Sequence, residues 1–143
     1  MLIDEILKGK GGAVTTVDAS ATLHVAAQLL DDKRIGAVVA VSEETGIAGV
    51  LSERDIVRQL ARNGAAGLEM KVAEAMTRGV ITASPGETID ACLGRMTDRR
   101  IRHLPVVKGA ELTGIISIGD LVKWKIDSVL AEAEAMTAYI KGG

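Results

Sequence analysis

The stretch GVLSERD at residues 49–55 returns as GIISIGD at residues 114–120, and this recurrence decides the fold. Both stretches carry a glycine, a serine and an aspartate at matching positions, at an offset of 65 residues. Upstream of them the offset is 66, so that Thr16 falls on Thr82 and Arg34 falls on Arg100. A register that persists over this distance with one slip in a turn indicates an internal repeat.

Each copy of the repeat predicts the same order of elements: strand, helix, strand, strand, helix. The expected strands lie at residues 14–17, 37–41 and 47–51 in copy one, and at 80–82, 104–107 and 112–117 in copy two. Thr22 and Thr88 are suited to cap the first helix of each copy, and the second helix starts near Asp55 or Asp120. Apolar runs without alternation, such as AVVAV at residues 37–41, are typical of strands covered on both faces.

One copy buries too little apolar surface to be stable alone, so the two copies are expected to share a core. The predicted fold is α/β of the α+β kind: two pseudo-twofold β-α-β-β-α repeats packed sheet to sheet, with clefts between them, plus a long C-terminal helix. The expected domains are repeat 1 with an N-terminal helix at residues 1–67, repeat 2 at residues 68–127, and a C-terminal helical extension at residues 128–143.

Composition excludes several classes of function. The 143 residues are 48% apolar and 25% charged, with a net charge of −2. Trp124 and Tyr139 are the only aromatic residues, so there is no row of rings for stacking bases, and the net charge does not favour a nucleic-acid partner. The chain has a single cysteine, Cys92, so an internal disulfide is ruled out, and we expect Cys92 to be a small buried apolar residue. No apolar run is long enough to span a membrane, and the acidic N-terminus is unlike a signal peptide, so a cytoplasmic protein is expected.

The repeated Ser-x-x-Asp supports two interpretations. A serine followed three residues later by an acid, just before an apolar helix, resembles a capping box. The same geometry suits a nucleotide, because a helix N-terminus offers free N–H groups to phosphate and a neighbouring carboxylate can hold both hydroxyls of a ribose. Spacing alone leaves both interpretations open, and one residue can serve both purposes.

Basic residues run into a buried strand in the stretch RRIRHLP at residues 99–105. Arg99 and Arg100 suit the C-terminal end of a helix. Arg102 and His103 lie where the chain turns inward, at the expected mouth of a cleft. Because copy one has Gly36 and Ala37 at these two positions, the two clefts are expected to differ in charge.

Motifs for catalysis and metal binding are missing. The chain has no phosphate loop, no Gly-x-Gly-x-x-Gly after a strand and no Gly-x-Ser-x-Gly. His24 has no second histidine or cysteine at ligand spacing. We therefore expect no catalytic residues and no metal site.

The last segment, residues 121–140, contains no proline or glycine and carries an apolar seam with alternating spacings of four and three residues. The seam consists of Val122, Ile126, Val129, Ala133, Met136 and Ile140. Such a seam covers the protein's own surface or pairs with another helix. Because the segment extends beyond its counterpart in copy one, we favour a partner helix, most simply that of a symmetry mate.

Over residues 1–127 the chain resembles the tandem cystathionine β-synthase (CBS) domain pair, or Bateman module. The resemblance rests on EAMT at residues 74–77, RHLPV at residues 102–106 and the two Gly-h-h-Ser-x-x-Asp ends (h, apolar) at residues 49–55 and 114–120. The chain is most similar to the small stand-alone bacterial CBS-pair proteins. Copy one departs from the pattern in having Val39 where copy two has Pro105.

The resemblance implies an adenosine-type ligand (AMP, ADP, ATP, NAD(H) or S-adenosylmethionine) and two composite sites. In one, Asp120 would hold the ribose, Ser117 would lie near the phosphate, Arg102 and His103 would bind phosphates, and Lys10, Thr15, Ile35 and Gly36 would surround the base. In the other, Asp55 would hold the ribose beside Ser52 and Arg54, and Met76, Thr77, Ile81 and Ile101 would complete the pocket.

The sequence thus predicts a non-catalytic regulatory module that binds an adenine nucleotide between its repeats and reports to an unidentified protein. We expect a homodimer formed through the repeats and the C-terminal helix. The alternative is a ligand-independent protein for dimerisation or partner interaction. A nucleotide-converting enzyme is a weaker alternative, for which the sequence offers no residues.

Overall fold

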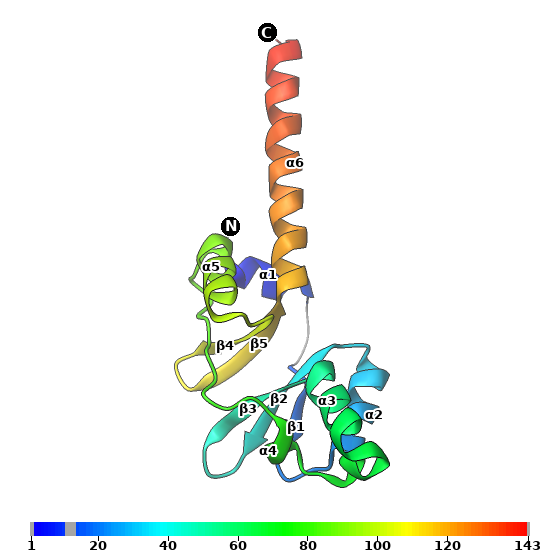
Figure 1. Ribbon diagram of the computed structural model, residues 1–143. Helices are drawn as coiled ribbons and strands as arrows, with labels where there is room; N and C mark the ends of the chain where they lie inside the picture. The colour runs from blue at the N-terminus through cyan, green and yellow to red at the C-terminus, as the bar shows by residue number, and fades with distance from the viewer. Residues whose placement is uncertain (1, 11–13, 143) are drawn as a thin grey trace. The chain divides into compact units, whose positions relative to one another are not determined.

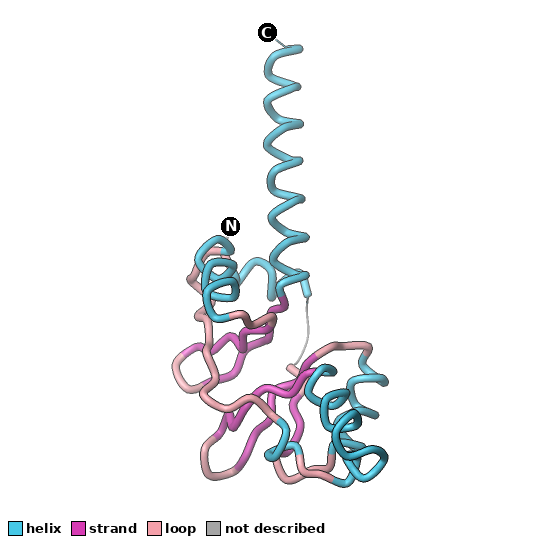
Figure 2. The backbone as a smooth tube through the Cα atoms, viewed as in Figure 1, coloured by secondary structure: helices cyan, strands magenta, loops and turns pink. Residues whose placement is uncertain are grey.

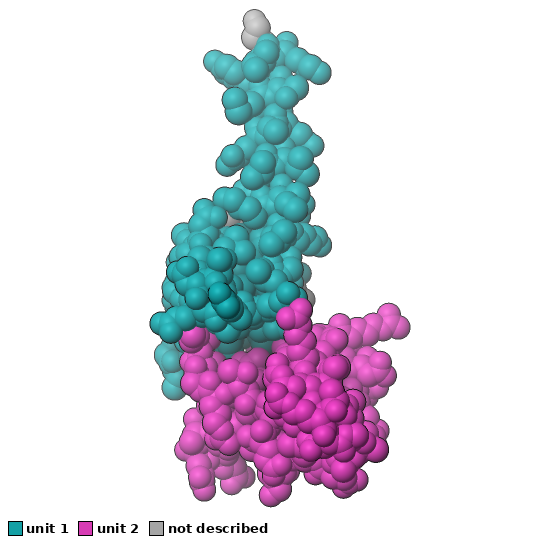
Figure 3. Space-filling model, in the orientation of Figure 1, with its two compact units in different colours: residues 1–13, 82–143 teal, residues 14–81 magenta. Residues whose placement is uncertain are grey.

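The computed structural model describes residues 2–10 and 14–142 (Figure 1). Its contacts divide the chain into two compact units, coloured separately in Figure 3. Unit 1 comprises residues 1–13 and 82–143, and unit 2 comprises residues 14–81. The predicted α+β class and the long C-terminal helix are confirmed, and the predicted order of elements is confirmed in full for copy one.

Unit 2 is copy one of the repeat together with the segment that follows it. Its elements are β1 (Thr16–Asp18), α2 (Leu23–Lys33), β2 (Ala37–Ser42), β3 (Gly46–Ser52), α3 (Glu53–Asn63), the 3-10 helix η1 (Gly64–Glu69) and α4 (Val72–Ala75). The sheet has the order β1-β2-β3, with β1 parallel and β3 antiparallel to β2. Figure 2 draws the strands of both units in magenta. Its core is aliphatic, with Leu23, Val38 and Leu51 fully buried.

Unit 1 contains copy two and both ends of the chain. Its elements are α1 (Ile3–Lys10), α5 (Ile89–Arg99), β4 (His103–Lys108), β5 (Glu111–Ser117) and α6 (Ile118–Gly142). Strands β4 and β5 form an antiparallel pair in which His103 lies opposite Ser117. Cys92 is fully buried on α5, as the sequence indicates, and burial raises the pKa of its thiol.

The first helix of each copy begins and ends in the same way. The hydroxyls of Thr22 and Thr88 accept hydrogen bonds from the backbone N–H three residues on, at 3.2 and 3.1 Å, so both predicted caps are confirmed. Each helix ends on an arginine, Arg34 or Arg100, in the left-handed region, with φ of 53° and 55°. The repeat therefore preserves even an unfavourable backbone conformation.

The strand expected at residues 80–82 is absent, and this prediction is wrong. Only Ala83 pairs with the sheet, through an isolated parallel bridge to Val106. Its N–H donates to the Pro105 carbonyl at 2.9 Å, and its carbonyl accepts from Val107 N–H at 2.8 Å. Because Pro105 has no N–H, it cannot donate the next bond of the ladder, whereas copy one has Val39 there and forms β1.

A short arm completes each unit in an equivalent way. In unit 2 the N–H groups of Val72 and Ala73 donate to the carbonyls of Ala21 and Ala19 at 2.8 and 2.9 Å. In unit 1 those of Ile3 and Asp4 donate to Glu87 and Pro85, the counterparts of Ala21 and Ala19 at offset 66, at 2.9 and 3.0 Å. The N-terminal helix thus packs with copy two, and the segment preceding copy two in the sequence packs with copy one.

Helix α6 continues far past its contacts with unit 1. Leu121 is fully buried, but every residue from 129 to 141 is exposed. Figure 1 shows the helix running away from the small β4–β5 sheet. Among the described residues, no helix is long and apolar enough to cross a membrane.

Candidate functional site

Asp55 is the buried polar residue of unit 2, with 7% of its surface exposed. Its Oδ2 accepts hydrogen bonds from the backbone N–H of Ser52 at 2.9 Å and from the Ser52 hydroxyl at 3.1 Å. Ser52 Oγ in turn lies 3.4 Å from Asp55 N–H, which completes a capping box at the start of α3. Arg58 donates to the other carboxylate oxygen at 3.1 Å. The capping interpretation therefore holds for Ser52 and Asp55.

Asp120 occupies the equivalent position at the start of α6. Its Oδ2 accepts from Ser117 N–H at 2.9 Å, and its own N–H donates to Ser117 Oγ at 3.0 Å. Asp120 is half-buried, so its carboxylate is more accessible than that of Asp55. Both repeats thus place one carboxylate, held by backbone, at a helix N-terminus.

The start of a strand lies beside each of these helix ends. In unit 1 the Arg102 carbonyl accepts from Ile118 N–H at 2.8 Å, and in unit 2 the Gly36 carbonyl accepts from Glu53 N–H at 2.9 Å. Since His103 also pairs with Ser117 across the sheet, unit 1 brings together four predicted site residues. These are Arg102, His103, Ser117 and Asp120.

The two helix ends differ in charge, as the sequence predicts. At the start of α3, Glu53 and Arg54 are both exposed, and a Cβ placed on Gly36 would lie 3.2 Å from the Glu53 carboxylate. At the start of α6 the corresponding residues are uncharged, and the exposed Arg102 replaces Gly36. An anion therefore meets the cationic Arg102 in unit 1, whereas in unit 2 it meets Arg54 together with the acidic Glu53.

The remaining predicted residues are distributed over both units. In unit 2, Thr15 and Ile81 are half-buried, Met76 is buried, and the backbone of Thr77 pairs with Val50 at 2.9 and 3.1 Å. In unit 1, Ile101 is half-buried and its N–H donates to the Met96 carbonyl at 3.0 Å. Lys10 ends α1, and its side chain lies outside the described residues. Each predicted composite set draws on both units, and the sets stay predictions.

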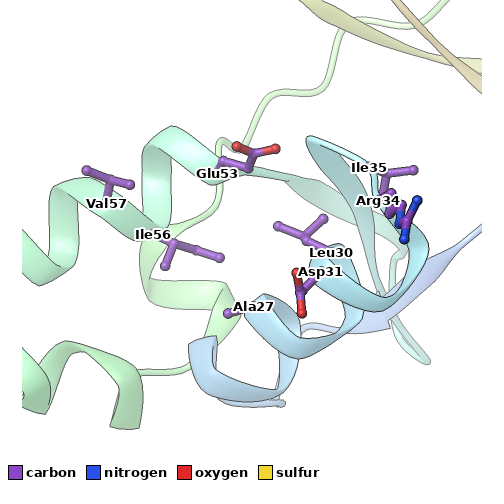
Figure 4. A pocket seen from close by; sticks show the side chains of 8 residues that line it. All are labelled: Ala27, Leu30, Asp31, Arg34, Ile35, Glu53, Ile56 and Val57. Carbon is purple, nitrogen blue, oxygen red and sulfur yellow. The ribbon is translucent and has the colours of Figure 1, made fainter.

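A groove of about 410 Å³ between α2 and α3 was not anticipated from the sequence. Figure 4 shows its lining: Ala27, Leu30, Asp31, Arg34, Ile35, Glu53, Ile56 and Val57. Of the predicted site residues, Ile35 alone lines it. The signal was present in the apolar spacing of Ala27 and Leu30 on one helix and of Ile56 and Val57 on the other.

Residues 2–10 and 14–142 contain no cluster of three or more His, Cys, Asp or Glu side chains that could hold a metal ion.

Comparisons with known proteins agree with this arrangement. The family model of the CBS domain matches twice, at residues 12–62 and 72–127. The crystal structure of the CBS-domain-containing protein ATU1752 from Agrobacterium tumefaciens is 39% identical in sequence, with a TM-score of 0.80 over 85% of this chain and 91% of that one.

Two further similar structures contain adenosine compounds. The CBS domain pair of the protein MJ0100, in complex with 5′-methylthioadenosine and S-adenosyl-L-methionine, is 26% identical, with a TM-score of 0.79 over 90% of this chain and 98% of that one. The CBS domain protein PAE2072 from Pyrobaculum aerophilum, complexed with AMP, is 27% identical, with a TM-score of 0.74 over 84% of this chain and 89% of that one.

Proposed function

Because the chain belongs to the CBS domain family, we propose that it is a non-catalytic regulatory module whose signal is an adenine nucleotide. The observation that carries the proposal is the group formed by Arg102, His103, Ser117 and Asp120 in unit 1. It combines a helix N-terminus, a carboxylate positioned for ribose hydroxyls and the exposed Arg102 for phosphate. The adenosine ligands of MJ0100 and PAE2072 support this ligand class.

We assign the two predicted site sets to two nucleotides of unequal affinity. The Asp120 set contains Arg102 and His103 and suits the more highly charged ligand, such as AMP or ATP. The Asp55 set has Arg54 as its cation, but Glu53 lies beside it and the Asp55 carboxylate already accepts from Arg58. A neutral or cationic adenosine compound is the better match for this second set.

The test must separate capping from binding, since Asp55 and Asp120 both cap helices. Replacement by asparagine keeps one oxygen for the cap but removes the carboxylate that accepts both ribose hydroxyls. We expect Asp120→Asn to weaken AMP binding about ten- to hundredfold, since a hydrogen bond to a charged group contributes about 1.5–3 kcal/mol. Isothermal calorimetry with AMP, ATP, NADH and S-adenosylmethionine measures this for Asp120→Asn and Asp55→Asn.

A matched control distinguishes phosphate recognition from a general loss of charge. Arg102→Ala should weaken AMP binding but leave adenosine binding unchanged, whereas Arg99→Ala, which removes an exposed arginine from the end of α5, should change neither. The proposal is wrong if none of the four ligands binds below millimolar concentration, or if both asparagine variants bind like the wild type.

The exposed half of α6 favours association as a second activity. We propose that the module is a homodimer and that nucleotide binding shifts its state, which requires different affinities for two arrangements. If association occurs without any nucleotide response, the ligand-independent interaction protein is the correct alternative.

A further inference from the structure

Helix α6 carries a long apolar stripe that the described residues leave uncovered. All six seam residues (Val122, Ile126, Val129, Ala133, Met136 and Ile140) are exposed, and the exposed fractions of the five large ones run from 44% to 72%. An isolated helix as short as residues 129–142 is marginally stable in water even with good helix-forming residues. This half of α6 therefore gains most from a partner.

The stripe is not the face by which α6 packs on its own unit. That face carries the buried Leu121, the Trp124 ring and Lys125. A Cβ placed on Gly9 would lie 2.8 Å from the Trp124 ring, and the Lys125 ammonium lies 3.0 Å from the Asp90 carboxylate. At 3.6 residues per turn, the stripe lies roughly a third of the way round the helix from this face. A second helix can therefore approach the stripe without displacing α5 or α1.

We propose that α6 pairs with α6 of a second copy, and that the two helices run antiparallel. In the proposed register Val122 faces the partner's Ile140, Ile126 faces the partner's Met136, and Val129 faces the partner's Ala133. The inference deepens the homodimer of the proposed function and is independent of nucleotide binding.

The spacing of the seam fits a second copy as the occupant, which the homodimer of the proposed function supplies. The intervals of four, three, four, three and four residues read the same in both directions, so the stripe is complementary to its own reversed copy. An isologous pair of this kind is closed and uses the same surface on both subunits. All six seam residues of each helix then contribute to the contact.

The single small residue of the seam selects the antiparallel direction. In a parallel pair Ala133 would face itself and leave a layer without a large side chain, which is a packing defect. In the antiparallel pair Ala133 lies opposite the β-branched Val129, and every layer contains a large side chain. Leu130, which is 56% exposed, flanks the centre and meets the partner's Leu130.

The antiparallel pair brings two like charges together, and the parallel pair does not. Glu132 flanks the centre on the side opposite Leu130, so in the proposed register it lies across from the partner's Glu132. In a parallel pair its neighbour would instead be the partner's Thr137. The antiparallel dimer should therefore gain affinity when this one charge is removed, and the parallel one should not.

Disulfide trapping tests the direction. In the full chain, with the buried Cys92 replaced by alanine, we expect Val122→Cys and Ile140→Cys to cross-link with each other after mixing under mild oxidation. Neither single variant should cross-link with itself, because each cysteine lies at the opposite end of the pair from its own copy. Self-cross-linking of either single variant, or no cross-link in the mixture, overturns the proposal.

Sedimentation equilibrium tests the register without introduced cysteines or cross-links. Glu132→Gln should tighten the dimer about two- to fivefold at low salt, the range expected for an exposed charge pair, and less at high salt. Glu134→Gln removes the same charge from the outward face and should change nothing. Equal effects of the two variants, or a wild-type monomer, overturn the pairing. AMP calorimetry on the same samples is a separate readout, so a failed pairing with intact AMP binding contradicts this inference alone.

Discussion

At the scale of single residues, Glu87 is a carboxylate that the structure ties to both backbone and side chain. It accepts from Ser84 N–H at 2.8 Å and pairs with the Arg95 guanidinium. Arg95 also donates to the Thr82 carbonyl at 3.0 Å, so the pair fastens the turn before α5 to that helix. The hydrogen bond from Arg95 is the main reason that the pKa of Glu87 is lowered in the folded chain.

Glu87→Gln should therefore destabilise the chain in a pH-dependent way. A pKa lowered by folding means that the carboxylate form stabilises the folded state, and this contribution is complete above the unfolded pKa of about 4.3. The contribution is lost as the pH falls through the folded value. We expect a cost of about 1.5 kcal/mol at pH 7, the low end of the range for a hydrogen bond to a charged group, shrinking below pH 4. Urea unfolding at pH 7 and pH 3.5 measures it, and a cost that does not depend on pH would contradict the assignment.

A residue's role could be predicted where it depends on the spacing of residues close together in the sequence. Thr22, Thr88 and the Ser-x-x-Asp caps follow from side chains placed three residues from a backbone N–H, and their geometry is confirmed. The left-handed Arg34 and Arg100 could not be predicted, because that conformation favours glycine. The contact of Asp55 with Arg58 could have been read from its spacing along α3.

At the scale of elements, two repeat-equivalent glycines let the arms approach the strands. A Cβ on Gly49 of β3 would lie 2.6 Å from Met76 Sδ and 2.7 Å from the Thr77 carbonyl oxygen. A Cβ on Gly114 of β5 would overlap with Leu7 Cδ2, on α1. The first obstacle includes backbone, whereas the second is the end of a flexible side chain.

This difference predicts a ranking of three alanine variants. Gly49→Ala should cost about 1–3 kcal/mol, as overpacking does, because the Thr77 backbone is held by its pairing with Val50. Gly114→Ala should cost less, since Leu7 can turn away. Gly94→Ala is the control, because Gly94 lies in helix α5 with open space around its Cβ position, and it should stabilise by about 0.5–1 kcal/mol. Urea midpoints that place Gly114→Ala below Gly49→Ala would contradict this reading of the contacts.

Elements whose pairing depends on residues distant in the sequence differ most from the expectation. The apolar runs gave β2, β3, β4 and β5 without ambiguity. The strand expected at residues 80–82 fails because of Pro105, a residue in another strand. The equivalence of α1 to the segment around α4 was missed because the offset between Ile3 and Val72 is 69, outside the register of the repeat.

At the scale of the whole molecule, the repeats in the sequence and the packing units are different divisions of the chain. The repeat boundary expected from the sequence lies between residues 67 and 68, whereas the units divide at 13/14 and 81/82. Unit 2 is continuous in sequence but needs residues 68–81, which the sequence division assigns to repeat 2. Unit 1 is discontinuous, because its arm is the N-terminal helix.

The division by contacts makes a prediction about fragments. Residues 14–81 should form a folded unit with a cooperative thermal transition, because they include Val72 and Met76, which belong to the core of unit 2. Residues 14–67 lack both side chains and the hydrogen bonds from Val72 and Ala73 to Ala21 and Ala19, so they should show no cooperative transition. At this size the margin of stability is small, and loss of two core side chains, each contributing about 1.5–3 kcal/mol, is enough to remove it.

Val72→Ala in the longer fragment is the graded control and should lower its melting temperature without abolishing the transition. Circular dichroism melts of the three fragments decide the matter: equal stability of 14–67 and 14–81 would mean that the repeat, not the unit with its arm, is the folding module.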